Sequence, residues 1–338
     1  MKIIITGGAG FVGARLARAL LAQGSLSLRG AAPAPISQIV IADRVPAPAA
    51  LAQDARISSE VGDLLDQLGS GSSNLLARHS DVQVIFHMAA AVSGECEANF
   101  DLGMRSNYAA THALLDSARA LGTKPTVFFA SSIAVFGRTP HHSFPDEIID
   151  TTLPTPQTSY GIQKLIGEQL MADYARKGFI SARSARLATV SVRAGLPNGA
   201  ASGFFSGMIR EPLKGIGCAI PVKPETVHSL SSPANTVRGI LASVQASDEA
   251  WGPLTALNLP ALPITVGEMA EGLKRNAGDS VHALLSWKID PVIEKIVQGW
   301  PTRMGSPRAQ ALGMRPNASF DEIVREHMAE NHPELLKP

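Results

Sequence analysis

The amino-terminal segment KIIITGGAGFVGARLARALLAQG constrains the fold more than any other part of the chain. Residues 2–6 form a short apolar, β-branched run of the kind that makes a buried strand. Gly7, Gly10 and Gly13 follow at once, and leucines then recur at helical spacing. A strand, a glycine-rich turn and a helix in this order are the setting of a dinucleotide-binding motif. The tight turn lets backbone approach a pyrophosphate, and the helix N-terminus offers it N–H groups. The alternative is a glycine-rich loop without a ligand.

A second strand signal, QIVIAD at 38–43, ends in Asp43. A carboxylate at that strand end accepts hydrogen bonds from the adenosine ribose hydroxyls and repels a 2′-phosphate. Asp43 lies further from the glycines than is usual, and the intervening segment 24–37, which has the Gly, Ser and Pro content of a surface loop, accounts for the excess. Arg44 follows directly and can tolerate a 2′-phosphate. We therefore expect NAD, with NADP as the open alternative.

Two further strand signals continue the pattern. EVGDLLD at 60–66 and VQVIFHMAAAVSG at 82–94 each contain a short strand, and the small residues that end the second would let a cofactor lie against backbone. Strands and helices alternate to about residue 190. This alternation predicts an α/β fold with a Rossmann-type doubly wound parallel sheet, in which ligands bind at the carboxyl ends of the strands.

The composition excludes several classes of protein. The chain has 338 residues, of which 45% are apolar and 17% charged, and its net charge of +1 gives no argument for a nucleic-acid or membrane partner. With Cys96 and Cys218 alone there is no disulfide framework, and neither a signal peptide nor a membrane span is evident, so we expect a cytoplasmic protein. The histidines at 141–142 lack further ligands at suitable spacing, and we expect no metal site.

Tyr160 and Lys164 are four residues apart in TSYGIQKLIGEQL at 158–170, where a helix is predicted to begin. Residues at this spacing lie on one helical face. A phenol titrates near pH 10, so it is a poor base at neutral pH unless a nearby cation favours the phenolate. Lowering its pKa by about three units takes roughly 4 kcal/mol. The pair by itself is either ordinary helix surface or a catalytic acid–base couple.

Taken in order, these motifs resemble the extended short-chain dehydrogenase/reductase family. The similarity covers nearly the whole chain and rests on TGGAGFVG at 6–13, GDL at 62–64, HMAA at 87–90, SSIAVFG at 131–137 and YGIQK at 160–164. The tail at 306–327 is similar to the closing strand-turn-helix of such proteins. The resemblance implies an NAD-binding Rossmann domain at 1–190, to which 231–260 returns. It also implies a smaller C-terminal substrate domain made of 191–230 and 261–338.

The resemblance also implies catalytic roles. Tyr160 would take the proton of a substrate hydroxyl as hydride leaves for the nicotinamide, and Lys164 would bind the nicotinamide ribose and stabilise the phenolate. Ser132 would hydrogen-bond the reacting oxygen, and Asn107 would lie near the proton relay. The implied cofactor-binding residues are Gly7, Gly10, Phe11, Val12, Gly13, Asp43, Asp63, Leu64, Met88, Ala89, Ala90, Ser131, Tyr160 and Lys164.

Two segments, 93–107 and 186–215, are similar to family members that act on small sugar acids rather than nucleotide sugars. The Asp-rich segment usual near position 230 of nucleotide-sugar enzymes is replaced here by VHSLSSPAN. We therefore expect oxidation of the C2 hydroxyl of a small sugar acid. The alternatives are a nucleotide-sugar 4-epimerase or dehydratase, and a non-catalytic NAD(P)-binding sensor. The candidate substrate-binding residues are Ser93, Ser132, Tyr160, Asn198, Ser202 and Arg210.

Some predictions concern residues outside the reacting centre. Arg210 is a candidate for binding the substrate carboxylate, but it fits a solvated helix position equally well. Arg183 and Arg186 lie at a predicted strand entry, and we assign them no charge function. His87, at the end of a buried strand, is expected to be structural. In the resemblance, the helices around 98–121 and 158–177 form a dimer surface, so we expect a homodimer.

Overall fold

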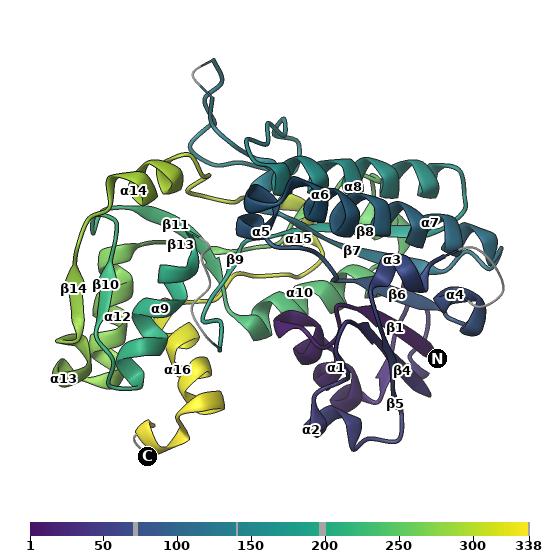
Figure 1. The fold of residues 1–338 in the computed structure, drawn as a ribbon, viewed down its shortest axis with the longest axis horizontal. Coiled ribbons are helices and arrows are strands. Elements are labelled where there is room, and N and C mark those ends of the chain that lie inside the picture. Colours follow the sequence, from purple (N-terminus) through teal and green to yellow (C-terminus); the bar gives the residue numbers. More distant parts are fainter. Residues whose placement is uncertain (70–73, 140, 196–200, 337–338) are drawn as a thin grey trace. The chain divides into compact units, whose positions relative to one another are not determined.

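The computed structural model describes residues 1–69, 74–139, 141–195 and 201–336 (Figure 1). The chain divides into two compact units, each assembled from separate segments. The first unit comprises 1–135, 156–186 and 237–257, and the second comprises 136–155, 187–236 and 258–338.

These boundaries differ in four places from the domains expected from the sequence, since 136–155, 187–190, 231–236 and 258–260 all belong to the second unit. Segment 136–155 belongs to the second unit, because Ile148 forms a parallel bridge with Met304 and the Asp150 carboxylate accepts a hydrogen bond from Asn258 N at 2.6 Å. The return to the first unit begins at Val237 rather than at 231.

A seven-stranded sheet forms the centre of the first unit, in the order β12-β8-β7-β6-β1-β4-β5. β1 pairs in parallel with both β4 and β6, so the strand order changes direction at β1. Such a switch point is where ligands bind in a doubly wound sheet. The predicted Rossmann-type fold is confirmed. The strands are β1 Lys2–Thr6, β4 Gln38–Asp43, β5 Ile57–Val61, β6 Val84–His87, β7 Thr126–Ser132, β8 Ser181–Leu187 and β12 Leu257–Asn258.

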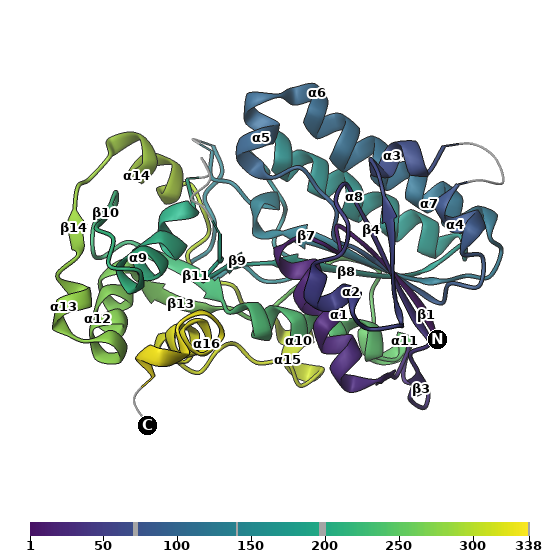
Figure 2. The same ribbon diagram turned by 60° about the horizontal axis from the view of Figure 1, so that its bottom comes forward.

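Helices cover both faces of this sheet. α7 (Ala110–Ala120) and α8 (Ser159–Arg176) lie on one face, and α1 (Phe11–Gln23) and α10 (Pro233–Gln245) lie on the other (Figure 2). The central strands β1, β4 and β6 are buried on both faces and carry nearly continuous apolar runs. One core cluster joins Ile4, Val40, Ile85 and Val127 to the apolar side of α7.

The shorter helices are α2 Ala49–Ala52, α3 Leu64–Gln67, α4 Leu75–Arg78, α5 Ser93–Ala98, α6 Phe100–Gly103 and α11 Asp248–Trp251. A π-helix, η1, covers Met104–Ala109, and a 3₁₀ turn, η2, covers Ile133–Val135.

Two surface features of this unit bear on the predictions. The expected loop at 24–37 contains a small antiparallel pair, β2 (Ser25–Leu26) with β3 (Ala34–Pro35), and Leu26 is buried. Phe100 and Ile162, on the helices expected to form a dimer surface, are exposed in the single chain. The homodimer stays a prediction.

None of the described helices is both long and apolar enough to cross a membrane.

The second unit contains two small sheets. β11 pairs in parallel with β9 and antiparallel with β13, and β10 pairs in parallel with β14. The strands are β9 Thr189–Val190, β10 Cys218–Ile220, β11 Val227–Ser231, β13 Leu262–Thr265 and β14 Leu285–Trp287. The helices are α9 Gly203–Leu213, α12 Val266–Ala277, α13 Asp279–His282, α14 Pro291–Gln298, α15 Pro307–Ala311 and α16 Phe320–Asn331, followed by a 3₁₀ turn, η3, at Pro333–Leu335.

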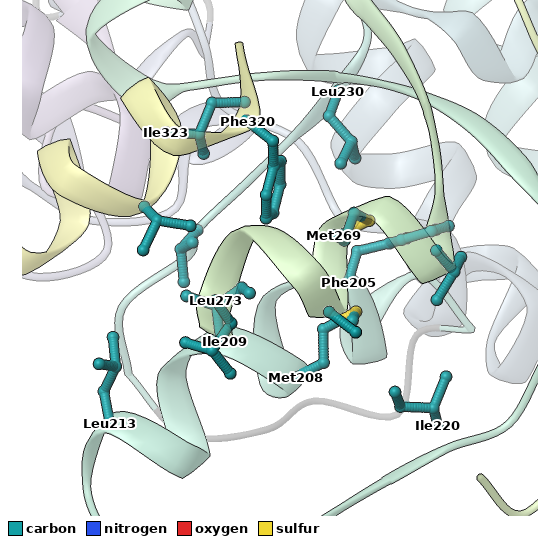
Figure 3. Close-up of a cluster of buried hydrophobic side chains, with 14 of the residues drawn as sticks. Phe205, Met208, Ile209, Leu213, Ile220, Leu230, Met269, Leu273, Phe320 and Ile323 are labelled. Atoms are coloured by element: carbon teal, nitrogen blue, oxygen red, sulfur yellow. The ribbon is translucent and has the colours of Figure 1, made fainter. Parts of the chain in front are cut away.

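Three of these helices close a separate hydrophobic core (Figure 3). Phe205 and Met208 of α9 pack with Met269 of α12 and with Phe320 and Ile323 of α16. A second core of this kind makes the second unit compact in its own right.

The expected strand-turn-helix at 306–327 is wrong in its first element, where the structure has the helix α15. The Ser306 hydroxyl caps α15 by accepting from Ala309 N, and Pro307 occupies the first helical position, where its missing N–H costs nothing.

Candidate active site

Backbone packing in the turn between β1 and α1 leaves no room for side chains. Gly7 has a φ of 67°, and a Cβ there would lie 2.7 Å from Ala89 N. A Cβ on Gly13 would lie 2.3 Å from Gly7 O. The two glycines therefore let the first turn of α1 rest directly on the loop that precedes it.

The N-terminus of α1 is suited to bind an anion. Gly10 is the N-cap and brings no side chain to the helix end, and the first turn holds no acidic residue. The N–H groups of Phe11 and Val12 have no acceptor within the helix, and the helix dipole adds positive charge at this end. These residues fit the pyrophosphate of a dinucleotide.

The Asp43 carboxylate is fixed beside this turn. Its Oδ2 accepts from Ala9 N at 3.0 Å and its Oδ1 accepts from Arg44 N at 2.7 Å. Because β4 pairs with β1, the end of β4 brings Asp43 to the glycine-rich turn. A carboxylate anchored there fits the ribose hydroxyls of an adenosine.

Asp63 and Leu64 lie at the start of α3, after the end of β5. Asp63 Oδ1 accepts from Leu65 N at 3.0 Å and also from Arg105 Nη2 at 3.0 Å. This ion pair is partly exposed, so it contributes little to stability, but it fixes the orientation of the carboxylate.

The segment after β6 runs along the end of β1. Met88 N donates to Thr6 O at 3.1 Å, and Ala89 N donates to Thr6 Oγ1 at 3.3 Å. Ala90 follows, and Ser93 then begins α5. The small side chains predicted to face a cofactor are half-buried here.

Asn107 holds this segment in place. Its Oδ1 accepts from Ala91 N at 2.8 Å, and its Nδ2 donates to Ala91 O at 3.1 Å and to Gln163 Oε1 at 2.8 Å. Asn107 lies in the π-helix η1, a widened turn of a kind often found at functional sites. Neither this turn nor the role of Gln163 is predictable from the sequence. The side chain thus links the segment after β6 to the helix that carries Tyr160.

His87 is buried and hydrogen-bonded through both ring nitrogens. Nδ1 lies 2.7 Å from Thr6 Oγ1, and Nε2 lies 2.9 Å from Thr111 Oγ1. The Thr111 hydroxyl donates to Asn107 O, so its oxygen accepts from Nε2–H of the imidazole. Burial, together with the charge of Lys164, lowers the pKa of His87 to about 3. His87 is therefore a neutral structural residue, in agreement with the prediction.

Ser132 and Tyr160 come from elements that pack closely together. Ser132 ends β7, and its Oγ accepts from Ala134 N at 3.1 Å. Tyr160 lies in the first turn of α8, which is capped by Thr158. A Cβ on Gly161 would lie 2.1 Å from Ala134 O. The glycine after Tyr160 therefore allows α8 to pack directly on the turn that follows Ser132.

Lys164 is buried beneath these residues. Its Nζ donates to Ala130 O at 2.9 Å and lies 5.6 Å from the centroid of the Tyr160 ring. Burial lowers the pKa of the ammonium to about 8. The predicted pairing of Tyr160 and Lys164 on one helical face is thus present in the structure, with a cation beside the phenol.

A buried ion pair that the sequence did not reveal lies one turn further along α8. Arg186 of β8 donates from Nε to Glu168 Oε1 at 2.9 Å and from Nη2 to Oε2 at 2.8 Å. The Ser131 hydroxyl donates to Glu168 Oε1 at 2.5 Å. Arg183 also has a carboxylate partner, Asp248. The expectation that these arginines carry no charge function is therefore wrong.

The candidates from the second unit form a separate group. Arg210 is buried, donates from Nε to Glu211 Oε1 at 2.6 Å and from Nη1 to Arg193 O at 2.8 Å, and so is not a solvated helix residue. Ser202 Oγ accepts from Arg193 Nη2 at 3.1 Å. Asn198 lies outside the described residues. Arg193, which belongs to no recognised motif of the sequence, contacts both of the other candidates.

The described part of the chain brings no three His, Cys, Asp or Glu side chains together as metal ligands. In the first unit, the glycine-rich turn, Asp43, the segment after β6 and the Ser132–Tyr160–Lys164 group all follow or pack against the carboxyl ends of sheet strands. This arrangement combines a dinucleotide site with a phenol, a hydroxyl and a buried cation that can handle a proton.

Comparison with known proteins agrees with this geometry. Residues 3–246 match the NAD dependent epimerase/dehydratase family. The chain is 45% identical to a D-erythronate dehydrogenase of Cupriavidus necator, over 97% of this chain and 98% of that protein. It is 35% identical to a D-erythronate dehydrogenase of Haemophilus influenzae, over 96% and 98%. A solved structure described as a nucleoside-diphosphate-sugar epimerase from Agrobacterium tumefaciens is 37% identical, with a TM-score of 0.88, and covers 99% of this chain and 95% of that one.

Proposed function

The chain belongs to the NAD dependent epimerase/dehydratase family, and we propose that it is an NAD-dependent dehydrogenase that oxidises the C2 hydroxyl of D-erythronate to the 2-oxo acid. The observation that carries the proposal is the identity to two D-erythronate dehydrogenases along nearly their whole length, which includes both compact units. Formation of NADH from D-erythronate, and from no nucleotide sugar, is the expected result.

The residues of the first unit support a proton-transfer role. A bound nicotinamide dinucleotide would supply the hydride acceptor for the hydrogen on C2. The Tyr160 phenolate would take the proton of the C2 hydroxyl, and the Ser132 hydroxyl would donate a hydrogen bond to the same oxygen as its charge changes. The Lys164 ammonium would favour the phenolate. One proton and one hydride leave the substrate, so the carbon–oxygen bond becomes a carbonyl.

We assign Asn107 a positioning role instead of a place in the proton relay. Its amide already bonds both the N–H and the carbonyl of Ala91, and it reaches α8 through Gln163. The Ser131 hydroxyl is likewise directed to Glu168. Both residues would then act by holding the segments that carry the cofactor-binding backbone and Ser132.

The substrate carboxylate requires donors, because an unpaired buried carboxylate is expensive to desolvate. In the second unit, Ser202 and Arg210 both contact Arg193. These two contacts support Arg193 as the residue whose guanidinium pairs with the substrate carboxylate. The Ser202 hydroxyl would lie beside that guanidinium. Arg210, which is already paired with Glu211, would support the backbone of Arg193.

Asp43 provides a prediction about the cofactor. We expect Asp43→Ala to raise the efficiency with NADP relative to NAD, because the anchored carboxylate that would repel a 2′-phosphate is removed. The measurement is the ratio of kcat/KM for the two cofactors. As a control, Asp63→Ala removes a carboxylate on a neighbouring strand end and should change the ratio much less. A wild-type enzyme that already prefers NADP strongly would contradict the assignment of Asp43.

A nucleotide-sugar epimerase remains the second candidate, favoured by the description of the solved structure from Agrobacterium tumefaciens. A non-catalytic dinucleotide sensor is a candidate of another class, and the complete Ser132–Tyr160–Lys164 group argues against it because a sensor has no use for a base. Turnover of a hydroxy acid with NAD separates the dehydrogenase from both alternatives.

A further inference from the structure

Glu168 lies four residues after Lys164, on the same face of α8. Its carboxylate joins three elements, since it accepts from Ser131 at the end of β7 and from two nitrogens of Arg186 on β8. Glu168, Arg186 and Lys164 are each 3% exposed. The charged side chains of Lys164, Glu168 and Arg186 are thus all buried in the same part of the first unit.

Lys164 needs an anion nearby to stay charged, because burial disfavours its ammonium form. The titratable groups around it are Tyr160 and Glu168 from its own helix, Cys96 from α5 and His87 from β6. Burial raises the pKa of the Cys96 thiol, and His87 is neutral, so neither carries charge at neutral pH. The Glu168 carboxylate, which is held in an ion pair with Arg186, supplies a negative charge that does not depend on the reacting phenol.

We propose that Glu168 is a positioning residue for Lys164, whose carboxylate, clamped by Arg186 and Ser131, keeps the Lys164 ammonium protonated in its buried site. The inference deepens the proposed function and rests on the role assigned there to Lys164. Glu168 acts through Lys164.

The contacts of Glu168 with Arg186 and Ser131 explain how a buried carboxylate can supply negative charge to Lys164. A buried carboxylate with no partner would take up a proton and lose its charge. Two parallel hydrogen bonds pair the Glu168 carboxylate with the Arg186 guanidinium, and the Ser131 hydroxyl satisfies a further lone pair. The same contacts tie α8 to the end of β7, from which Ser132 projects. An ion pair that served stability alone would leave the titration of Lys164 unaffected.

The test is to measure the pKa of Lys164 by NMR in the protein without cofactor. Lysine is labelled with carbon-13 at Cε, and the Lys164 signal is identified by its absence from the spectrum of Lys164→Arg. We expect Glu168→Gln to lower the pKa of Lys164 by about one unit, as the loss of a nearby anion requires. Glu168→Asp, which retains the charge, should keep the titration close to wild type. In active protein, the alkaline fall of kcat/KM should move to lower pH by the same amount in the glutamine variant.

Two further variants separate the electrostatic role from a structural one. Glu168→Gln leaves Arg186 buried without its partner and is expected to lower stability. The double variant Glu168→Gln/Arg186→Met removes both charges and keeps the volume filled. It should lower the pKa of Lys164 by a smaller amount, because the loss of the Arg186 cation offsets part of the loss of the anion. Asp248→Asn is the matched control, because it breaks the other arginine–carboxylate pair of β8 and should leave Lys164 unchanged.

An unchanged pKa of Lys164 in Glu168→Gln, or in the double variant if the single one does not fold, would overturn the inference. A loss of thermal stability with a wild-type titration would mean that the pair is only structural, and would overturn it equally. The titration uses neither substrate nor cofactor. Failure of D-erythronate turnover would therefore count against the proposed function and leave this result standing.

Discussion

Tyr160→Phe lowers kcat by about 10²- to 10⁴-fold, the usual contribution of a general base, while the dinucleotide still binds. The phenylalanine ring keeps the packing of the first turn of α8, including its position beside the Lys164 ammonium, and only the proton acceptor is lost. Steady-state kinetics give kcat, and isothermal titration calorimetry gives the affinity for NAD.

A second tyrosine on the same helix provides the control. The Tyr174 hydroxyl donates to Asp116 Oδ1 at 2.6 Å near the other end of α8. Tyr174→Phe removes the same atom from a site away from Ser132 and should keep normal turnover. Near-normal turnover in Tyr160→Phe, equal to that of the control, would remove Tyr160 from the mechanism.

Gly161→Ala is expected to lower kcat by about 100-fold without removing any reacting group. The new Cβ would lie 2.1 Å from Ala134 O, so α8 has to move away from the turn that follows Ser132. A displacement of about 1 Å can cost a factor of this size, because the base and the hydrogen-bond donor must meet the same substrate oxygen. The measurements are kcat and the melting temperature.

Gly207→Ala is the matched control for this substitution. Gly207 is also a buried helical glycine, in α9, but its Cβ would lie 3.7 Å from the nearest atom, Cys218 Sγ, which is an ordinary contact. Alanine is the better helix former, so this variant should be as stable as wild type or slightly more stable. If Gly161→Ala turns over as fast as Gly207→Ala, the close packing of α8 on the Ser132 turn does not position the site.

The local parts of the site could be predicted from the sequence. The turn from β1 into α1 is specified by adjacent residues, since Gly7 needs a positive φ and Gly13 needs close backbone packing. Asp43 could be placed because it ends an apolar run. The spacing of Tyr160 and Lys164 fixes a common helical face.

The parts that were missed depend on contacts between distant segments. Glu168 was visible at helical spacing from Lys164, but its partner Arg186 lies on β8, and nothing in the sequence shows that β8 meets this face of α8. The sequence fits Arg210 equally well to solvent and to substrate, because it does not show which residues surround Arg210 in the fold. Segment 136–155 joins the second unit through Met304 and Asn258, more than a hundred residues away.

In the tail, a local signal in the sequence points away from the strand that the resemblance implies. Ser306 followed by Pro307 is a typical helix start, and α15 begins there. The π-helix around Asn107 is a different case. It widens a helix whose residues give an ordinary helical pattern, so the sequence could predict the helix but not the geometry that directs Asn107 towards Ala91.

The central claim is tested most directly by incubating the purified protein with NAD and, in separate reactions, with D-erythronate, other four-carbon sugar acids, and UDP- and GDP-sugars. NADH is followed by absorbance and the products by mass spectrometry, with Tyr160→Phe as the inactive control. The account predicts NADH and a 2-oxo acid from D-erythronate, with no conversion of the nucleotide sugars. Conversion of a nucleotide sugar, with no NADH from any sugar acid, would contradict it.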